Sequence, residues 1–278
     1  MKIFRTNAGT IIEHEGGRSL IPHHDWDDLF RQDDLQSYLE HQIDSAEDSG
    51  DKNATPLSPV SGQEIWAAGV TYFRSRDARM AESEQAGGGD FYDRVYTAER
   101  PELFYKGSAR TVADPKSTVH IRADSAWNVP EPELALAIDN SGRIFGYTIG
   151  NDMSSRDIEG ENPLYLPQAK IYDGSSSLGP GILICNSAID PSTKISMEIF
   201  REGVTIFSGI TTVAELKRTP KELVKYLYRH NTFPHGCFLM TGTGIVPPDN
   251  FTLQANDHIE ITIESIGTLT NTVDTLAV

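Results

Sequence analysis

The chain contains the stretch PEPELALAIDNSGRIFGYTIGND at residues 130–152. Two apolar runs flank Asp139–Gly142, a combination of Asp, Asn, Ser and Gly that is typical of a hairpin turn. Alternation with a period of two points the side chains of Glu131 and Glu133 to the same face of the first strand. If the turn folds the second strand back antiparallel, Asp152 returns close to Glu133. The stretch therefore predicts a β-hairpin that carries three carboxylates at one end.

Three carboxylates held side by side repel one another, so such a cluster favours a bound cation. Oxygen ligands with no His or Cys nearby select a hard cation, Mg²⁺ with Mn²⁺ or Ca²⁺ as alternatives, over zinc. Spacing alone leaves another interpretation open, in which Glu131 and Glu133 form a solvated strand edge and Asp152 is a turn residue. We expect a metal site at Glu131, Glu133 and Asp152, with coordination positions left for substrate and water.

The overall composition excludes some partners. The 278 residues include 24 Lys+Arg and 40 Asp+Glu, which gives a formal net charge of −16. An acidic chain without a basic stripe is a poor candidate for nucleic acids or anionic membranes, so we expect neither as a partner. No apolar run approaches the ~20 residues that span a bilayer, and no signal-peptide pattern is visible. Cys185 and Cys237 lie in apolar surroundings, which favours buried free thiols and a cytoplasmic location.

The composition also changes near residue 60. Residues 1–60 combine a strand-like start, Lys2–Ile12, with a helical pattern from Asp25 to about Ala46, where Asp25 is a plausible N-cap. A polar stretch with two prolines, residues 44–60, follows and is typical of a linker. We therefore expect a small N-terminal domain at 1–60 and a second domain at 61–278.

The second domain is predicted to be rich in strands. A buried strand is expected at Glu64–Tyr72, a polar helix at Arg74–Gln85 that ends at three glycines, and a helix capped by Thr219. Residues 166–180 form a polar, glycine-rich connection that is expected to lack secondary structure, as functional loops often do. Five short alternating or apolar runs are predicted to be further strands: Glu133–Ile138, Arg143–Ile149, Gly181–Cys185, Ser196–Phe200 and Ile259–Ile263.

At these residues the sequence resembles the fumarylacetoacetate hydrolase superfamily. The family's Glu-x-Glu motif and its later Asn-Asp-x-Ser-Ala-Arg-Asp motif appear here as Glu131-Pro132-Glu133 and Asn151–Asp157. The similarity extends over about residues 64–278, and its other matches are Phe104–Lys106, Lys170 before Gly179-Pro180, Met240–Gly244 and Asp257–Leu269. The resemblance implies an α+β, β-rich fold, with a mixed β-roll catalytic domain and a small N-terminal α/β domain. It also implies Mg²⁺ on the two glutamates and the aspartate, and assembly as a homodimer or homotetramer.

One departure from the family bears on the reaction. Hydrolytic members carry a catalytic histidine in the segment that corresponds to Gly69–Arg79, which here contains none. Activation of water needs a base with a pKa near the operating pH, and arginine is permanently charged. The run Asn162–Lys170 is more similar to the 2-keto-3-deoxypentonate dehydratases of the superfamily. The resemblance therefore implies a small 2-oxo acid substrate that loses water to give 2,5-dioxopentanoate, with the metal acidifying the C3 proton.

The resemblance also suggests roles for individual residues. Lys170 is expected to transfer the C3 proton, provided that burial or neighbouring cations lower its pKa, and the alternative is a purely electrostatic anchor. Arg156 is expected to orient Asp152 or a substrate oxygen, and the alternative is an ion pair with Asp157 or Glu161.

Glu159 is a candidate acid or substrate contact. The remaining candidates for substrate binding are Tyr72, Arg74, Ser75, Arg76, Lys106 and Thr243. Two other functions stay open at this point: hydrolysis of an acylpyruvate or related diketone, and a non-catalytic ligand-binding protein that keeps the fold.

Overall fold

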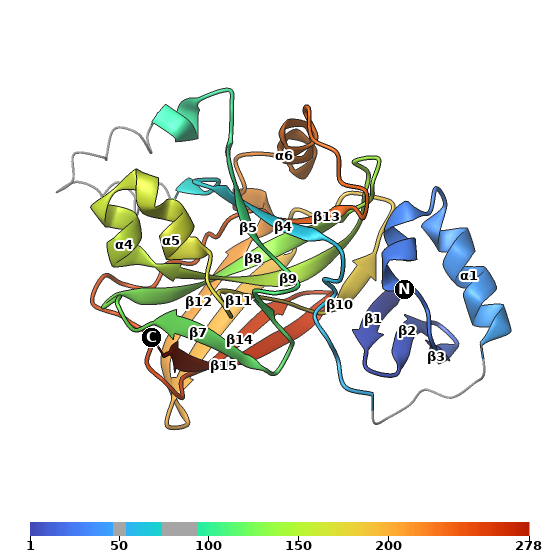
Figure 1. Ribbon diagram of the computed structural model, residues 1–278, viewed down its shortest axis with the longest axis horizontal. Coiled ribbons are helices and arrows are strands. Elements are labelled where there is room, and N and C mark those ends of the chain that lie inside the picture. Colours follow the sequence, from blue (N-terminus) through green and yellow to red (C-terminus); the bar gives the residue numbers. More distant parts are fainter. Residues whose placement is uncertain (47–53, 74–93, 278) are drawn as a thin grey trace.

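The structure is a computed structural model that describes residues 1–46, 54–73 and 94–277. Within these ranges the chain forms a ten-stranded sheet and a five-stranded sheet (Figure 1). The order of the larger sheet is β3-β2-β1-β10-β9-β8-β13-β4-β5, with β6 also paired to β10. Its strands are β1 (Lys2–Thr6), β2 (Gly9–His14), β3 (Gly17–Ile21), β4 (Glu64–Gly69), β5 (Glu102–Ser108), β6 (Val112–Ala113), β8 (Asn128–Ile138), β9 (Ile144–Ser155), β10 (Ser176–Ile184) and β13 (Cys237–Met240).

The smaller sheet has the order β12-β11-β14-β15-β7. Its strands are β7 (Thr118–Arg122), β11 (Lys194–Arg201), β12 (Val204–Thr212), β14 (His258–Ile263) and β15 (Gly267–Leu276). The helical segments include η1 (Trp26–Arg31), α1 (Leu35–Ser45), α4 (Arg156–Glu161), η2 (Pro163–Tyr165), α5 (Leu166–Lys170), η3 (Val213–Glu215) and α6 (Pro220–Leu227). The two sheets pack together, so the strand-rich fold expected from the sequence is confirmed.

The predicted hairpin is present as β8 and β9, which lie between β13 and β10 in the middle of the larger sheet. The Asp139 carboxylate accepts hydrogen bonds from the backbone N–H groups of Ser141 and Arg143, which fixes the turn. The strand register then sets Glu131 opposite Asp152. Because both strands are buried along nearly their whole length, the hairpin carries its carboxylates into the interior.

Strand β8 also separates two hydrophobic cores. Its even-numbered residues, such as Leu134 and Leu136, pack with Ile259 and Ile261 of the smaller sheet. Its odd-numbered residues, such as Ala135, pack in a second cluster with residues of the N-terminal segment. A strand buried on both faces reads as a continuous apolar run, which is the pattern of residues 134–138.

The N-terminal segment differs from its predicted form in two ways. A continuous helix from Asp25 to Ala46 is wrong, because η1 and α1 are separated by an extended residue, Gln32, and Asp34 caps the second helix through Ser37. The N-cap at Asp25 is confirmed. Residues 54–60, expected as part of a linker, are packed, since the Trp26 indole donates to the Pro59 carbonyl oxygen at 2.6 Å and Val60 is buried.

Strand β1 pairs antiparallel with β10, so β1, β2 and β3 continue the larger sheet. These strands and α1 lie together at one end of the molecule (Figure 1). The division of the chain into two domains near residue 60 stays a prediction.

Two further predictions need correction. The connection at residues 166–180 is not free of secondary structure, because α5 begins with Pro167 in its first turn, where proline is well tolerated, and β10 begins at Ser176. The strand expected at Glu64–Tyr72 ends at Gly69, since Val70 has a φ of 52° and turns the chain. The helix expected at Arg74–Gln85 and the glycines after it lie outside the described residues.

The strand-like start predicted at Lys2–Ile12 is not one strand, because it divides into β1 and β2 around a turn at residues 7–8. The remaining predictions on elements hold. The Thr219 side chain caps α6 by accepting from the Glu222 N–H, and the other strand runs are confirmed as parts of β10, β11 and β14. Both cysteines are free thiols, as predicted, and Cys237 is buried. The predicted burial of Cys185 is wrong, because this residue follows the end of β10 and is partly exposed. None of the helices described is long and apolar enough to cross a membrane.

Candidate metal and catalytic site

The carboxylates of Glu131, Glu133 and Asp152 meet in the interior. Each contributes an oxygen that lies within 4.8 Å of the others, and all three residues are buried. Glu131 and Asp152 are cross-strand neighbours in β8 and β9, and Glu133 follows on the same face of β8. The predicted clustering of these carboxylates is therefore confirmed, and the interpretation as a solvated strand edge is wrong.

The environment of Glu133 indicates a place for a cation. Its Oε2 accepts a hydrogen bond from the backbone N–H of Gly242. Burial raises the pKa of Glu133 well above its ordinary value, and the charges of Asp152 and Glu131 raise it further. A divalent cation among the three carboxylates would offset this repulsion, and the all-oxygen ligand set suits a hard ion such as Mg²⁺. The residues present thus fit the predicted magnesium ion.

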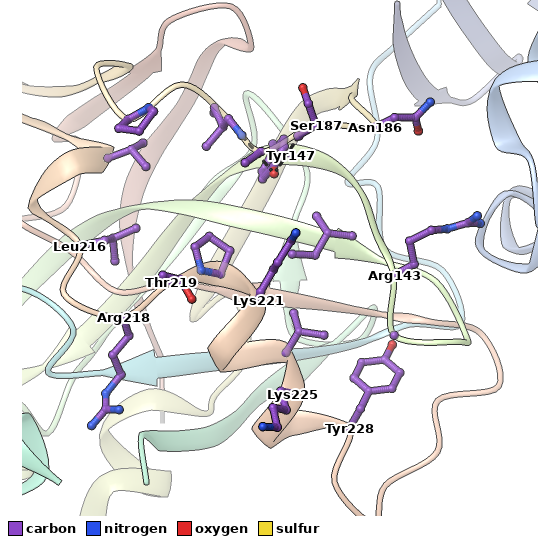
Figure 2. Close-up of a pocket in the computed structure, with 18 of the residues that line it drawn as sticks. Arg143, Tyr147, Asn186, Ser187, Leu216, Arg218, Thr219, Lys221, Lys225 and Tyr228 are labelled. Carbon is purple, nitrogen blue, oxygen red and sulfur yellow. Dashed lines mark hydrogen bonds between the residues drawn. The ribbon is translucent and has the colours of Figure 1, made fainter. Parts of the chain in front are cut away.

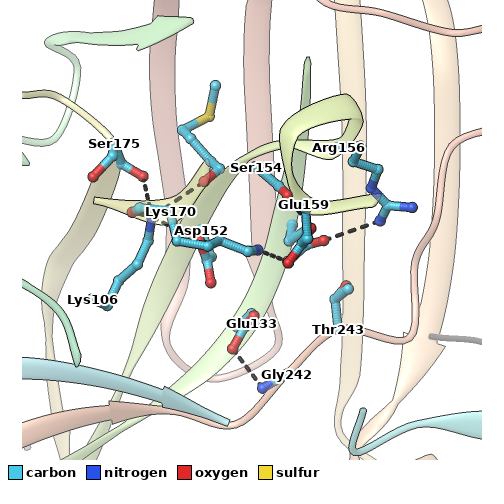
Figure 3. A network of polar contacts seen from close by, with 12 residues as sticks. Lys106, Glu133, Asp152, Ser154, Arg156, Glu159, Lys170, Ser175, Gly242 and Thr243 are labelled. Atoms are coloured by element: carbon cyan, nitrogen blue, oxygen red, sulfur yellow. Dashed lines mark hydrogen bonds and ion pairs between the residues drawn. The ribbon is translucent and has the colours of Figure 1, made fainter. Parts of the chain in front are cut away.

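Two buried cations contact the same carboxylates (Figure 3). The Lys170 ammonium, at the end of α5, lies 2.6 Å from Glu131 Oε2 and 3.4 Å from Asp152 Oδ1. The Arg156 guanidinium, at the start of α4, lies 3.0 Å from Glu131 Oε1. Glu131 is therefore held from two sides by helices that follow β9.

The partner of Arg156 differs from the expected ones. The sequence suggested Asp152 or a substrate oxygen, or an ion pair with Asp157 or Glu161, but the guanidinium is paired with Glu131. Contact with a substrate oxygen stays a prediction. Asp157 instead accepts hydrogen bonds from the Ser125 hydroxyl and a neighbouring backbone N–H. The pairing depends on the hairpin register, which places Glu131 next to the end of β9 where α4 begins.

Lys106, on β5, is fully buried beside Asp152. Its ammonium lies 2.9 Å from Asp152 Oδ1 and donates to the backbone carbonyl oxygens of Met153 at 3.2 Å, Ser175 at 2.9 Å, and Lys170 (Figure 3). Burial lowers the pKa of Lys106, and the charge of Lys170 lowers it further, against the opposing effect of Asp152. Because an ammonium has three N–H donors, these four acceptors use its whole hydrogen-bonding capacity. Lys106 thus connects β5, β9, the end of α5 and the turn before β10.

Tyr72 and Thr243 lie on the side of the site near Glu133. Burial raises the pKa of the Tyr72 phenol, and the charge of Glu133 contributes. The Tyr72 ring packs against Gly244, two residues after the Gly242 N–H that binds Glu133. Thr243 is buried, follows Gly242 in the chain, and donates from its hydroxyl to the Ile245 carbonyl oxygen.

Glu159, on α4, is buried and accepts a hydrogen bond from the Ser154 hydroxyl at 2.8 Å. Arg74, Ser75 and Arg76 lie outside the described residues. Their predicted contacts with substrate stay predictions, as do the catalytic and binding roles of the other candidates.

The sequence did not single out Gly242, whose backbone N–H binds Glu133. Its φ is +91°, and a Cβ there would lie 2.0 Å from the Thr71 hydroxyl oxygen, so only glycine fits without displacement. Thr71 in turn donates to the Thr241 carbonyl oxygen at 2.6 Å. The glycines of the Met240–Gly244 loop were the available signal, although they do not reveal which N–H faces Glu133.

Comparison with known proteins agrees with this geometry. The sequence profile described as "Fumarylacetoacetate (FAA) hydrolase C-terminal" matches residues 65–274. The chain therefore belongs to the fumarylacetoacetate hydrolase family.

Three of the similar proteins are named for the same kind of reaction. A Haloferax volcanii protein named "Probable 2-keto-3-deoxyxylonate dehydratase" is 47% identical over 246 residues, which cover 88% of this chain and 83% of that protein. The 2-dehydro-3-deoxy-D-arabinonate dehydratase of Saccharolobus solfataricus is 42% identical over 214 residues, covering 76% of this chain and 72% of that protein. The solved structure of 2-keto-3-deoxy-D-arabinonate dehydratase complexed with magnesium and 2,5-dioxopentanoate superposes with a TM-score of 0.83, at 32% identity and full coverage of both chains.

Proposed function

We propose that this chain is a metal-dependent dehydratase that converts a 2-keto-3-deoxypentonate to 2,5-dioxopentanoate with loss of water. The observation that carries the proposal is the buried carboxylate triad with the Lys170 ammonium 2.6 Å from one of its members. The similar dehydratases named for this chemistry, and the solved structure with magnesium and 2,5-dioxopentanoate, support it.

Glu131, Glu133 and Asp152 are the residues that would hold Mg²⁺. When bound, the ion supplies Lewis acidity, which makes the C3 proton of a 2-oxo acid more acidic and stabilises negative charge that develops on the 2-oxo oxygen. The protein residues around it account for the other parts of the reaction.

Lys170 is the candidate for proton transfer at C3. Its Nζ is buried within contact distance of two of the three carboxylates, so a substrate bound at the triad lies beside it. Removal of the C3 proton and departure of the C4 hydroxyl as water give a 2-oxo acid with a C3=C4 double bond. Transfer of a proton from C5 to C3 then gives the C4=C5 enol, whose tautomerisation gives the aldehyde of 2,5-dioxopentanoate. Glu159, buried near the start of α4, is the candidate acid that protonates the leaving hydroxyl.

Lys106 and Arg156 act as positioning residues. Arg156 fixes one oxygen of Glu131, and Lys106 fixes Asp152 together with the backbone carbonyl of Lys170. Groups that orient metal-binding carboxylates typically contribute 10-fold to 100-fold in metal affinity or activity. Substrate contacts are assigned to Tyr72 and Thr243 and, beyond the described residues, to Arg74, Ser75 and Arg76. Assembly as a homodimer or homotetramer and the predicted compartment stay predictions.

Proton NMR of the purified protein tests the proposal. Incubation with D- and with L-2-keto-3-deoxypentonate in the presence of Mg²⁺ should produce the aldehyde hydrate of 2,5-dioxopentanoate from at least one isomer, and EDTA should prevent it. Two carbon fragments in place of one dehydrated product would indicate the hydrolase alternative. No change with either isomer, in protein shown to be folded, would overturn the dehydratase proposal.

A further inference from the structure

A cavity lies away from the carboxylate triad. It has a volume of about 1040 Å³, opens to solvent and is lined by residues of the turn between β8 and β9, the segment from Asn186 to Pro191, η3 and α6 (Figure 2). It begins where β8 ends at Ile138, seven residues from Glu131, which corresponds to about 23 Å along a strand. The cavity is therefore separate from the metal and catalytic site.

The walls of this cavity are held in place by hydrogen bonds. The Tyr228 hydroxyl donates to the Asp139 carbonyl oxygen at 2.6 Å and ties α6 to the hairpin turn. The Tyr147 hydroxyl donates to the Ser187 carbonyl oxygen at 3.3 Å and accepts from the Ile189 N–H at 3.2 Å (Figure 2). Because these hydrogen bonds already order the walls, binding of a ligand does not carry the entropy cost of ordering them.

The charge of the lining is unusual for this chain. Four cations, Arg143, Arg218, Lys221 and Lys225, line the cavity, and no Asp or Glu is among the described residues that do so. The whole chain, in contrast, carries 40 acids and 24 Lys+Arg. Apolar side chains such as Ile144 form much of the remaining wall.

Two of the four cations are already engaged. Arg143 pairs with Asp139 at 2.8 Å, and Arg218 pairs with Glu222 at 2.7 Å and also donates to backbone carbonyls. In Figure 2 the two arginine side chains extend away from each other at opposite ends of the cavity, whereas Lys221 points toward Tyr147 and Ser187. Lys221 and Lys225 are both exposed, and neither forms a salt bridge within the described part of the chain.

We propose that this cavity binds a small amphiphilic anion, in which an apolar body carries a carboxylate, sulfonate or phosphate group. The apolar wall receives the body of the ligand, and Lys221 and Lys225 contact the anionic group. A cavity of this size that combines apolar walls with a few polar groups is typical of small-molecule sites.

Fluorescence titration with 8-anilinonaphthalene-1-sulfonate tests the proposal, because this probe combines an aromatic body with a sulfonate. Wild-type protein should bind one equivalent saturably. The variant Lys221→Ala/Lys225→Ala should bind at least 10-fold more weakly, and Ala188→Trp, which places a bulky side chain in the cavity and keeps both lysines, should also weaken binding. The charge-matched variant Arg18→Ala/Lys194→Ala, altered at two exposed side chains elsewhere, should bind as wild type does.

A neutral probe separates the charge effect from simple apolar adsorption. N-phenyl-1-naphthylamine has the same aromatic body without the sulfonate, so its binding should be weak and unaffected by the loss of the lysines. Probe binding should also survive in Lys170→Met, which excludes binding at the catalytic site. Equal affinity of wild type and Lys221→Ala/Lys225→Ala for the sulfonate probe, or its loss in Lys170→Met, would overturn the proposal. Because these readouts need no turnover, they are independent of the proposed dehydratase activity.

Discussion

Lys170 and Glu131 form a buried ion pair in which Nζ and Oε2 are 2.6 Å apart, although the residues are 39 positions apart in the chain. The same ammonium is 3.4 Å from Asp152 Oδ1. A buried cation between two candidate metal ligands serves the proposed reaction either as the base that takes the C3 proton or as an electrostatic anchor.

Two substitutions separate these roles of Lys170. Lys170→Met removes both the base and the charge, and we expect kcat to fall by roughly 10²-fold to 10⁴-fold, the usual contribution of a general base. Lys170→Arg keeps the charge but cannot accept a proton at working pH, so it should be as inactive as Lys170→Met if the lysine is the base. Steady-state kinetics with circular dichroism as a folding control measure both. Full turnover by Lys170→Met would contradict either role.

Loss of Lys106 should affect both folding and catalysis. Lys106→Met leaves Asp152 and three backbone carbonyls without their shared donor, and breaking a buried ion pair costs about 3–5 kcal/mol in the free energy of unfolding. The matched control is Lys194→Met, which removes an exposed pair with Glu264 and should cost less than about 1 kcal/mol. Urea unfolding compares the two.

A positioning role for Lys106 also predicts a particular kinetic change. In Lys106→Met, kcat and the affinity for Mg²⁺ should fall together, with KM changed less, because the lysine holds the metal ligand and the backbone of Lys170. A large rise in KM with unchanged Mg²⁺ affinity by calorimetry would instead indicate direct contact between Lys106 and the substrate.

Gly242→Ala should reduce the stability of the protein and its Mg²⁺ binding far more than alanine at another glycine of similar backbone conformation. Gly203 has a φ of +79° with nothing within 4 Å of a Cβ, so Gly203→Ala should cost only about 1–2 kcal/mol of backbone strain. Gly242→Ala adds a collision with Thr71 and moves the N–H that binds Glu133. We expect a larger loss of stability and weaker Mg²⁺ binding for Gly242→Ala alone. Equal effects of the two variants would refute this role of the loop.

Magnesium binding should depend on pH through Glu133. Its pKa lies above the ordinary value of 4.5 in the folded, metal-free protein, so between the two values the folded state binds more protons than the unfolded chain. The metal-free protein therefore loses stability as pH rises through this interval, whereas Mg²⁺ affinity, which needs the carboxylate, rises. Calorimetric titrations at a series of pH values should show the trend, and Glu133→Gln should flatten it. A pH-independent affinity in the wild type would contradict the assignment.

The two cysteines should differ sharply in reactivity. Burial raises the pKa of the Cys237 thiol to about 12, so at pH 8 it remains protonated and inert, while Cys185 is partly exposed. We expect one thiol to react with an aromatic disulfide reagent in the native protein and the second only in denaturant. Cys185→Ser should abolish the native reaction. Two equally fast thiols in the native wild type would be inconsistent with the packing around β13.

The carboxylate triad could be predicted from the sequence because its determinants are local. Period-two alternation places Glu131 and Glu133 on one face, and the turn at Asp139 fixes the register that returns Asp152. Two similar local signals, the N-cap at Thr219 and the proline after it, were sufficient to predict α6 from the sequence.

The contacts of Lys106 could not be predicted in this way. Its acceptors come from β9, the end of α5 and the turn before β10, and no sequence spacing brings these segments together. The partner of Arg156 was missed for the same reason, since Glu131 is 25 residues earlier and becomes a neighbour only through the hairpin. The break in the N-terminal helix was not predicted because the segment contains two capping residues, Asp25 and Asp34, and the second of them starts a new helix.

The pairing of β1 with β10 has a consequence for synthesis of the chain. Ile3 pairs with Ile182, which is translated 182 − 3 = 179 residues later. At cellular elongation rates of about 5–20 residues per second, β1 waits on the order of 10–40 s for its neighbour. During that time the hairpins of β1, β2 and β3 expose an unpaired edge to the ribosome surface and to chaperones. Completion of the larger sheet is later still, because β13, Cys237–Met240, must be synthesised before β4 and β5 can join β8.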